Sequence, residues 1–516
     1  MLTPYRPEPY VNFAETEPRQ KMLDALAMVR SQLGRSYPLR IGGKVVETSD
    51  TIKSLKPAEE HVVVGFVSKA SAAHADQAVR SAAEACKSWS RVAPEARARV
   101  IAKAAGIMRR RLYELAAWMC FEESKSWIEA YADTCEAIDF CDFYAREMLR
   151  LGGPQPVTPA AGEDNELRYV PLGVIVVIPP WNFPLAICTG MTTAALVTGN
   201  AVVLKPSSAS PVIAAIMTEI LEEAGLPPGV LNFVPGSGAE MGDVLVDHQL
   251  TRAVAFTGSK EVGLRIFERC SKIAPGQIWL KRTILEMGGK DCIFVDETAD
   301  IDAAAEGVVA ATFGFQGQKC SACSRLIAHR AVYDELLGKV LERARALTLG
   351  DTTAADNYYM GAVIDRSAFK TISAYIEVGR KEGRMVLGGQ PVPAGGYFIP
   401  PTIVADVAPQ SRIAQEEIFG PVLAVIKCQD FDDGLSIVNG TEYGLTGALY
   451  SRERLRLERA RSEFHVGNLY LNRKCTGALV DVQPFGGFNM SGTDSKAGGR
   501  DYLQLFMQGK SIAERF

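Results

Sequence analysis

The sequence predicts an α/β protein with two lobes, each built on a mainly parallel sheet. From residue 168 onward, short runs of β-branched and other apolar residues alternate with segments of helical length. Such runs are typical of strands that are buried on both faces of a parallel sheet. A second alternating series begins at CIFV (292–295) and continues past residue 450, within a chain of 516 residues. This length is sufficient for two or more folding units.

The elements of the first lobe follow from the apolar pattern. Residues 16–36 and 70–150 repeat apolar side chains at intervals of three and four, so we expect helices there. The serines before Pro211 and the glycine at 225 mark the expected start and end of one later helix. We expect alternating strands and helices at 173–178, 184–198, 200–204, 210–225, 229–234, 238–248, 253–256 and 260–273.

Composition excludes several classes of protein. Hydrophobic residues make up 47% and charged residues 22%, and the formal net charge is −4. Without a basic excess, nucleic acids and anionic membrane surfaces are not expected partners. Prolines and glycines interrupt the uncharged stretch 169–204, which therefore predicts a buried strand, turn, helix and strand in place of a membrane span. The N-terminus lacks the apolar core of a secretory signal, and the 11 cysteines are typical of reduced thiols, so we expect a cytoplasmic protein.

Three loops rich in small residues follow predicted strands, at 205–207, 236–242 and 257–263. Ligands of parallel sheets bind beyond the carboxyl ends of the strands, where backbone amides and helix N-termini can face a phosphate. The run GSGAEMG departs from the dinucleotide fingerprint G-x-G-x-x-G because its third glycine is one residue late. Two interpretations therefore stay open from these loops alone: a nucleotide site, or tight turns between strands and helices.

Cys320 and Cys323 form a C-x-x-C motif. No second C-x-x-C or close histidine pair supplies the remaining zinc ligands, and His329 is the only nearby imidazole, so no metal site is predicted. A thioredoxin-type pair belongs at the first helix of a small βαβ unit, which is not the context here. Taken alone, each cysteine is compatible with a buried free thiol.

Five motifs give Cys320 a further interpretation. They occur in the order PWNFP (180–184), FTGS (256–259), LEMGGKD (285–291), GFQGQKCSA (314–322) and EEIFGPV (416–422). Together they resemble the aldehyde dehydrogenase superfamily over nearly the whole chain. The segments NGTEYGLTGALYS (439–451) and EFHVGNLYLNRKCTGALVDVQPFGGFNMSGTDSKAGG (463–499) are similar to those of the bacterial single-activity 1-pyrroline-5-carboxylate dehydrogenases. The resemblance implies a Rossmann-type cofactor domain beside an α/β catalytic domain, with a small oligomerisation element.

The implied reaction is oxidation of L-glutamate γ-semialdehyde, formed from 1-pyrroline-5-carboxylate, to L-glutamate with NAD(P)+, the second step of proline catabolism. The alternative is an NAD(P)-dependent dehydrogenase of another small aldehyde. By resemblance Cys320 is the nucleophile, Asn182 the oxyanion donor beside the Cys320 N–H, and Glu286 the base that activates water. Outside their motifs, Glu286 would be typical of a surface carboxylate and Asn182 of a turn residue. A free thiol with a pKa of ~8.5 needs local activation to react.

For the cofactor, the resemblance implies NAD, with Lys205 on the adenosine ribose and Glu417 on the nicotinamide ribose. Many NAD-specific relatives carry Glu where this chain has Ser208, and a carboxylate there would repel a 2′-phosphate, so NADP stays open. The expected cofactor-binding residues are Ile178, Pro179, Trp181, Lys205, Ser208, Gly238, Gly242, Phe256, Thr257, Gly258, Ser259, Gly288, Glu417 and Phe419.

For the substrate, the resemblance implies that the Ser321 hydroxyl and the backbone amides of Gly477 and Ala478 bind the α-carboxylate. Neutral donors that converge on an anion can replace an arginine. Phe183 and Phe485 are expected beside the aliphatic chain of the substrate, and ordinary core packing is the alternative for both.

The expected domain division has three parts. Residues 1–152 and 170–286 form the N-terminal helices and the NAD-binding domain, and residues 287–496 form the catalytic domain. The resemblance implies that segments 153–169 and 497–516 pair subunits, so we expect a homo-oligomer that is at least a dimer.

Overall fold

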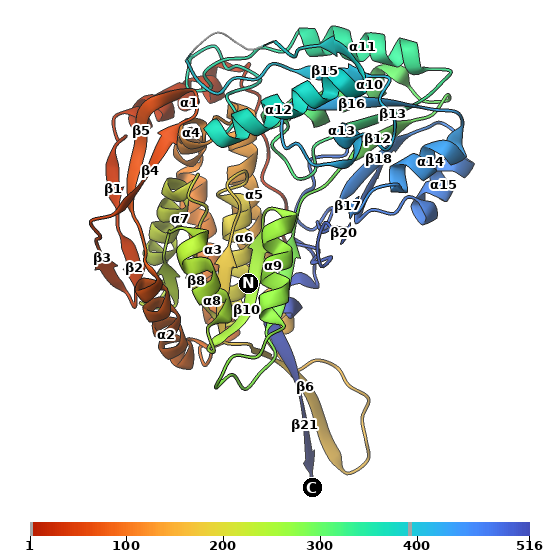
Figure 1. Cartoon of the computed structure of the whole chain (residues 1–516). Coiled ribbons are helices and arrows are strands. Elements are labelled where there is room, and N and C mark those ends of the chain that lie inside the picture. The colour runs from red at the N-terminus through yellow and green to blue at the C-terminus, as the bar shows by residue number, and fades with distance from the viewer. Residues whose placement is uncertain (1–3, 391–394) are drawn as a thin grey trace.

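The computed structural model describes residues 4–390 and 395–516. Two α/β lobes lie side by side, and a two-stranded arm projects from them (Figure 1). Within the described residues, each lobe contains a seven-stranded sheet. The predicted α/β class with two lobes is therefore confirmed.

The first sheet has a parallel core of five strands, to which two antiparallel strands are added at one edge. Four of the five core strands were predicted, at 173–178, 200–204, 229–234 and 253–256; the fifth, β11 (Arg282–Glu286), and the two edge strands, which come from the N-terminal region, were not. The strand order is β11 (Arg282–Glu286), β10 (Thr251–Thr257), β7 (Val174–Ile178), β8 (Ala201–Leu204), β9 (Leu231–Phe233), β2 (Leu39–Ile41) and β3 (Lys44–Val46).

Helices cover both faces of this sheet. On β7, Ile175 and Val177 pack into the core shared with the helices of one face, and Val174 and Val176 pack into the core of the other. This explains why the strand is apolar at every position. The first face carries α1 (Thr16–Arg30), α3 (Pro94–Arg110), α4 (Leu112–Glu122), α5 (Trp127–Leu151), α6 (Ala186–Val197) and α7 (Pro211–Glu223); the second carries α2 (Ala72–Trp89), α8 (Asp243–Asp247) and α9 (Lys260–Cys270).

The helix expected over residues 16–36 ends earlier than predicted. Helix α1 stops at Arg30, and Gly34 with a φ of 80° turns the chain into a strand. Only glycine adopts this left-handed conformation without steric cost. The strand belongs to a small sheet of order β1 (Arg35–Tyr37), β5 (Glu59–Ser68) and β4 (Thr51–Lys56).

The second sheet is parallel except for its edge strand β14, which pairs antiparallel with β15. Its order is β14 (Arg384–Leu387), β15 (Thr402–Ala405), β16 (Val422–Cys428), β13 (Arg325–His329), β12 (Cys292–Val295), β18 (Thr446–Tyr450) and β19 (Asn468–Leu471). The helices of this lobe are α10 (Ile301–Phe313), α11 (Tyr333–Arg345), α12 (Arg366–Glu382), α13 (Arg412–Gln415), α14 (Phe431–Asn439) and α15 (Arg454–Glu463). Shorter elements are β17 (Tyr443–Gly444) paired with β20 (Phe488–Asn489), the single turns η1 (Gly238–Gly242) and η2 (Gly314–Gly317), and η3 (Tyr502–Phe506).

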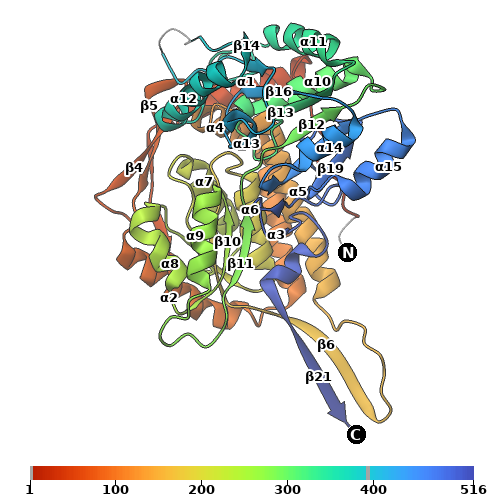
Figure 2. The same cartoon turned by 45° about the vertical axis from the view of Figure 1, so that its right-hand side comes forward.

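The arm consists of β6 (Glu163–Pro171) and β21 (Met507–Arg515), which pair antiparallel along their full length. It points away from both lobes and carries the C-terminus at its tip (Figure 2). In residues 4–390 and 395–516, no helix combines the length and the apolar character that crossing a membrane requires.

Candidate active site

Cys320 lies on the loop between η2 and β13, where the two lobes meet. Before it, Phe315, Gln316 and Gly317 all have positive φ values, so the backbone makes a tight left-handed turn just before the cysteine. A Cβ atom on Gly289 would lie 2.7 Å from the carbonyl oxygen of Cys320. Glycine is required at that position because any side chain there would displace the cysteine loop.

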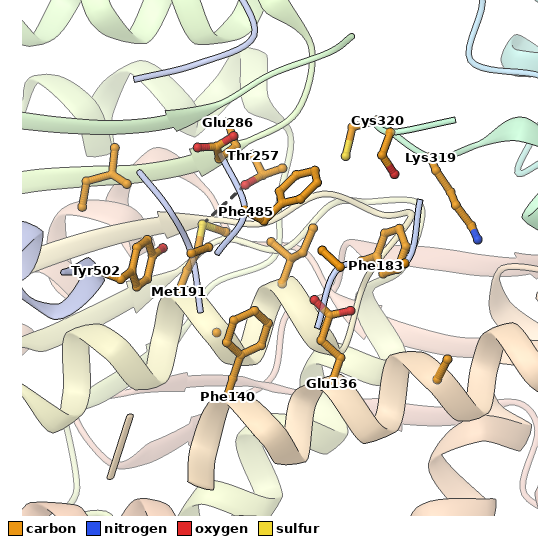
Figure 3. A pocket seen from close by; sticks show the side chains of 18 of the residues that line it. Glu136, Phe140, Phe183, Met191, Thr257, Glu286, Lys319, Cys320, Phe485 and Tyr502 are labelled. Atoms are coloured by element: carbon orange, nitrogen blue, oxygen red, sulfur yellow. Dashed lines mark hydrogen bonds between the residues drawn. The ribbon is translucent and has the colours of Figure 1, made fainter. Parts of the chain in front are cut away.

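A pocket opens beside Cys320, with about 1100 Å³ of space that includes its solvent-exposed mouth. Figure 3 shows Cys320 and Glu286 on one side of it and Glu136 and Phe140 of α5 on the other. Of the residues predicted from the sequence, those that line this one pocket are Cys320, Glu286, Phe183, Ser321, Gly477, Ala478, Phe485, Phe256 and Thr257.

Glu286 is the last residue of β11, and three hydrogen bonds hold its carboxyl group. Oε1 accepts from the Ser495 hydroxyl at 2.6 Å and from the Ser495 amide at 3.2 Å, and Oε2 accepts from the Gly487 amide at 3.3 Å. Burial raises the pKa of Glu286 to about 7, against the lowering effect of these hydrogen bonds. A carboxyl group with a pKa near neutrality can accept and return a proton, as a general base requires.

The Cys320 thiol is held in its neutral form at rest. Burial raises its pKa, and the negative charges of Asp291 and Glu286 raise it further. Thiolate is the reactive form, so a reaction at this thiol requires that its proton be removed as the substrate binds. The Glu286 carboxylate faces the same pocket.

Asn182 is buried and does not itself line the pocket, but the next residue, Phe183, does. Its side-chain amide nitrogen donates to the carbonyl oxygen of Gln318 at 3.0 Å, two residues before Cys320. Asn182 therefore fixes the cysteine loop and has a second amide hydrogen left to donate.

The predicted cofactor residues lie at the carboxyl ends of the parallel strands of the first sheet and on a facing loop of the second lobe. Ile178 ends β7, with Pro179 and Trp181 after it, and Lys205 and Ser208 follow β8. The Gly258 amide, after β10, donates to the backbone oxygen of Glu286. The Trp181 ring meets the ring of Phe419 edge-on, with 5.5 Å between the centroids.

The donors at this edge fit a dinucleotide. Lys205 is buried, and among the described residues its ammonium group has no hydrogen-bond or ion-pair partner; burial lowers its pKa to about 8. A Cβ atom on Gly238 or Gly242 would meet no atom within 4 Å, so the turn has open space on its outer side. Ser259 caps the N-terminus of α9, the type of position where phosphate oxygens bind.

Glu417 adds a carboxyl group on the facing loop. Its Oε1 accepts from the Gly289 amide at 3.0 Å, and burial raises its pKa to about 6. A Cβ atom on Gly288 would lie 2.2 Å from Oε2 of Glu417, so glycine at 288 leaves room for this carboxyl group. The arrangement suits a carboxylate that accepts hydrogen bonds from ribose hydroxyls.

Sequence reasoning missed three features of the pocket. Ser495, on the C-terminal loop, supports Glu286. Lys319 and Glu129 form an ion pair of 2.6 Å in the pocket wall. Glu136 also lines the pocket, and among the described residues its carboxyl group has no hydrogen bond or ion pair; burial and the charge of Asp133 raise its pKa to about 8. For Glu129 and Glu136, the available signal was the recurrence of acidic side chains among the apolar residues of α5.

Cys320 and Cys323 are both free thiols. In the part of the chain that the structure describes, no group of three or more histidine, cysteine, aspartate or glutamate side chains is arranged to hold a metal ion.

The sequence model of the aldehyde dehydrogenase family matches residues 45–512. The chain belongs to this family. It is 57% identical over 516 residues to a 1-pyrroline-5-carboxylate dehydrogenase of Geobacillus kaustophilus and 55% identical to 1-pyrroline-5-carboxylate dehydrogenase 2 of Bacillus subtilis, each match covering 100% of both chains.

Comparison with solved structures gives the same family assignment. A crystal structure of 1-pyrroline-5-carboxylate dehydrogenase from Thermus with bound NAD matches with a TM-score of 0.98 and 52% identity, over 100% of both chains. Proline utilization A from Bdellovibrio bacteriovorus matches with a TM-score of 0.97 and 43% identity, over 99% of this chain and 53% of that one.

Proposed function

We propose that this protein oxidises L-glutamate γ-semialdehyde to L-glutamate with NAD+, as the second step of proline catabolism. The semialdehyde forms when 1-pyrroline-5-carboxylate is hydrolysed. The observation that carries the proposal is a single pocket that contains a thiol, a carboxyl group with a pKa of about 7, and a loop of neutral donors. Full-length similarity to 1-pyrroline-5-carboxylate dehydrogenases from several bacteria supports the choice of substrate.

The first step is attack by the Cys320 sulfur on the aldehyde carbon. The thiol proton leaves to water in the pocket, and a carbon–sulfur bond forms as the carbonyl electron pair moves to oxygen. Negative charge develops on the aldehyde oxygen, where the free amide hydrogen of Asn182 and the Cys320 N–H stabilise it. Loss of one such donor typically costs about 10²–10³ in rate.

When bound, NAD+ would supply the acceptor for the hydride that leaves the tetrahedral centre. The chain's own residues would hold the cofactor: Lys205 would donate to the adenosine ribose, the turn at Gly238 and the cap at Ser259 would face the pyrophosphate, and Glu417 would accept from the nicotinamide ribose. Ser208, which is exposed after β8, places no negative charge beside the adenosine ribose. NADP is therefore the second expected cofactor.

The last step is hydrolysis of the thioester on Cys320. Glu286 accepts a proton from water, the water oxygen bonds to the acyl carbon, and the carbon–sulfur bond breaks to release glutamate. The hydrogen bonds from Ser495 and Gly487 hold the carboxyl group of Glu286 in place for this role.

Selectivity comes from contacts with the two charged groups on the α-carbon of the substrate and with its aliphatic chain. Ser321 and the amides of Gly477 and Ala478 bind the α-carboxylate, and Phe183 contacts the aliphatic chain together with Phe485. Glu136 binds the α-ammonium group, which distinguishes an α-amino acid from a simple carboxylic acid. Its carboxyl group has no partner among the described residues, and an α-ammonium group would provide one, with proton loss from Glu136 as the ammonium binds.

Assay of the purified protein decides between this reaction and another aldehyde on the same scaffold. NADH formation is measured with 1-pyrroline-5-carboxylate, propanal and succinate semialdehyde. The proposal predicts the highest kcat/KM with 1-pyrroline-5-carboxylate; a higher value with either of the other aldehydes contradicts it.

We further propose that the chain acts as a homo-oligomer, at least a dimer, through segments 153–169 and 497–516. The arm of β6 and β21 projects away from both lobes (Figures 1 and 2). In and after α9, the side chains of Phe267, Ile278 and Leu280 are 55%, 86% and 80% exposed. Exposed apolar side chains that lie together are typical of protein–protein interfaces.

The proposed domain boundaries are 1–152 with 170–286, and 287–496. The two sheets support these boundaries. The last strand of the first sheet in chain order, β11, ends at Glu286, and the first strand of the second sheet, β12, begins at Cys292. The free state of all 11 cysteines supports a cytoplasmic location.

A further inference from the structure

The ammonium group of Lys125 lies between two aromatic rings next to the pocket. The side chain is fully buried. Its Nζ is 4.1 Å from the centroid of the Phe183 ring and 4.4 Å from the centroid of the Phe315 ring. A desolvated cation is attracted by the face of an aromatic ring more strongly than an exposed one. Lys125 therefore joins two rings that come from different segments of the chain.

Asp133 completes this arrangement. Its Oδ2 is 2.7 Å from the Lys125 Nζ, and the side chain is also fully buried. Its Oδ1 accepts from the backbone amide of Ala186 at 2.6 Å, three residues after Phe183. A buried charge is tolerated when it is paired and hydrogen-bonded, as both charges are here. One carboxylate thus fixes the ammonium group and also the backbone that follows Phe183.

The two rings belong to the two segments that form the reactive end of the pocket. Phe183 lines the pocket and follows Asn182. Phe315 has a φ of 49° and lies in the tight turn that leads to Cys320. The Gln316 side-chain amide donates to the carbonyl oxygen of Ser124, directly before Lys125, at 3.1 Å. The segment around Lys125 is thus bonded to both sides of the site.

We infer that Lys125 is a positioning residue for the active site. Its ammonium group orients the Phe183 ring toward the substrate chain and sets the spacing between this ring and the Cys320 loop. The inference rests on the proposed function in one respect, since Phe183 is there assigned to the substrate chain. Lys125 itself does not line the pocket, so it acts through the two rings and contacts no substrate.

The test compares charge removal at Lys125 with a matched change elsewhere. The double variant Lys125→Met/Asp133→Asn removes both buried charges together, and Lys125→Arg keeps the cation. Lys56→Met/Asp351→Asn is the control, because Lys56 is 1% exposed, is 2.6 Å from Asp351 and lies over the Phe121 ring, but does not line the pocket. KM and kcat are measured with the semialdehyde and with pentanal, alongside the Kd of NAD+ and the melting temperature.

We expect the Lys125→Met/Asp133→Asn variant to raise the KM for both aldehydes about tenfold, with kcat reduced less than about threefold. Lys125→Arg restores most of the affinity, and the Kd of NAD+ stays within about twofold of the wild type in every variant. The control lowers the melting temperature and leaves both KM values unchanged. An unchanged KM in the Lys125 variant, or an equal rise in the control, overturns the inference.

A second variant covers the case in which the double variant does not fold. Phe315→Leu removes one ring and keeps the ion pair of Lys125 and Asp133; we expect a rise in KM of about threefold for both aldehydes, and an unchanged KM contradicts the inference. Failure of the proposed function is recognised separately, in the wild type, as equal kcat/KM with pentanal and the semialdehyde.

Discussion

Ser495 donates a hydrogen bond to Glu286 across 209 residues of sequence, with 2.6 Å between the hydroxyl and Oε1. The contact ties the C-terminal loop to the end of β11 in the first sheet. It also stabilises the charged form of a carboxyl group whose burial favours the neutral form. Burial therefore raises the pKa of the proposed base, and a residue far away in sequence limits that rise.

The first prediction concerns this contact. Because the hydrogen bond favours the carboxylate, Ser495→Ala should raise the pKa of Glu286 above its present value of about 7. Loss of a hydrogen bond to a charged group, ~1.5–3 kcal/mol, corresponds to about one to two pH units. Hydrolysis needs deprotonated Glu286, so the acidic limb of the kcat profile should move to higher pH. Ser495→Thr keeps the hydroxyl and should keep the wild-type limb; identical profiles for wild type and Ser495→Ala would contradict the assignment.

The second prediction separates the two chemical steps. Cys320→Ser should abolish turnover while NAD+ binding persists, because the hydroxyl is a much weaker nucleophile than the thiolate. Glu286→Gln should retain a first burst of NADH and then stall, since the thioester forms but water is not activated. Stopped-flow and steady-state assays read the two phases. A wild-type steady-state rate in Glu286→Gln means that Glu286 is not the base.

The third prediction concerns cofactor choice. Since Ser208 brings no negative charge to the loop after β8, NADP should support a measurable rate, poorer than that of NAD. Ser208→Glu should depress kcat/KM for NADP far more than for NAD, by repulsion of the 2′-phosphate. The ratio of the two kcat/KM values is the readout. An equal loss with both cofactors places Ser208 away from the 2′ position.

The fourth prediction tests Glu136 as the partner of the α-ammonium group. Glu136→Gln should raise the KM for the semialdehyde about tenfold or more, as expected for loss of a charge-assisted hydrogen bond of ~1.5–3 kcal/mol. The same substitution should leave the KM for 5-oxopentanoate nearly unchanged, because this aldehyde has the carboxylate and lacks the amino group. Equal rises for both substrates assign Glu136 to the shape of the pocket.

Strands β7 and β8 of the first sheet were predictable because they are apolar at every position. Ile175 and Val176 show the reason, since they pack into opposite faces of the sheet. The strand after Arg30 was not predictable, because the apolar spacing of α1 continues as far as Leu33, and the positive φ of Gly34 is not evident from the sequence. Strands β2 and β3 escaped prediction because three-residue strands have too little pattern to distinguish them from loops.

At the site, local motifs pointed to Cys320, Glu286 and Ser321, which the structure brings to one pocket. Ser495 and Glu136 were missed because their proximity depends on the tertiary fold. Glu136 lies on α5, where a charged residue is usually a solvated one, and only its place on the pocket wall gives it another interpretation.

The central claim is that the pocket selects an aldehyde that carries an α-carboxylate. The most direct test is kcat/KM of the wild-type enzyme with L-glutamate γ-semialdehyde and with pentanal, together with Ser321→Ala on both. Pentanal has no carboxylate, so it leaves the donors of the pocket unpaired. The kcat/KM for the semialdehyde should therefore be higher by about a hundredfold or more. Ser321→Ala should raise KM for the semialdehyde and leave pentanal nearly unaffected. Comparable wild-type values for the two aldehydes would contradict the account and leave a general aldehyde dehydrogenase.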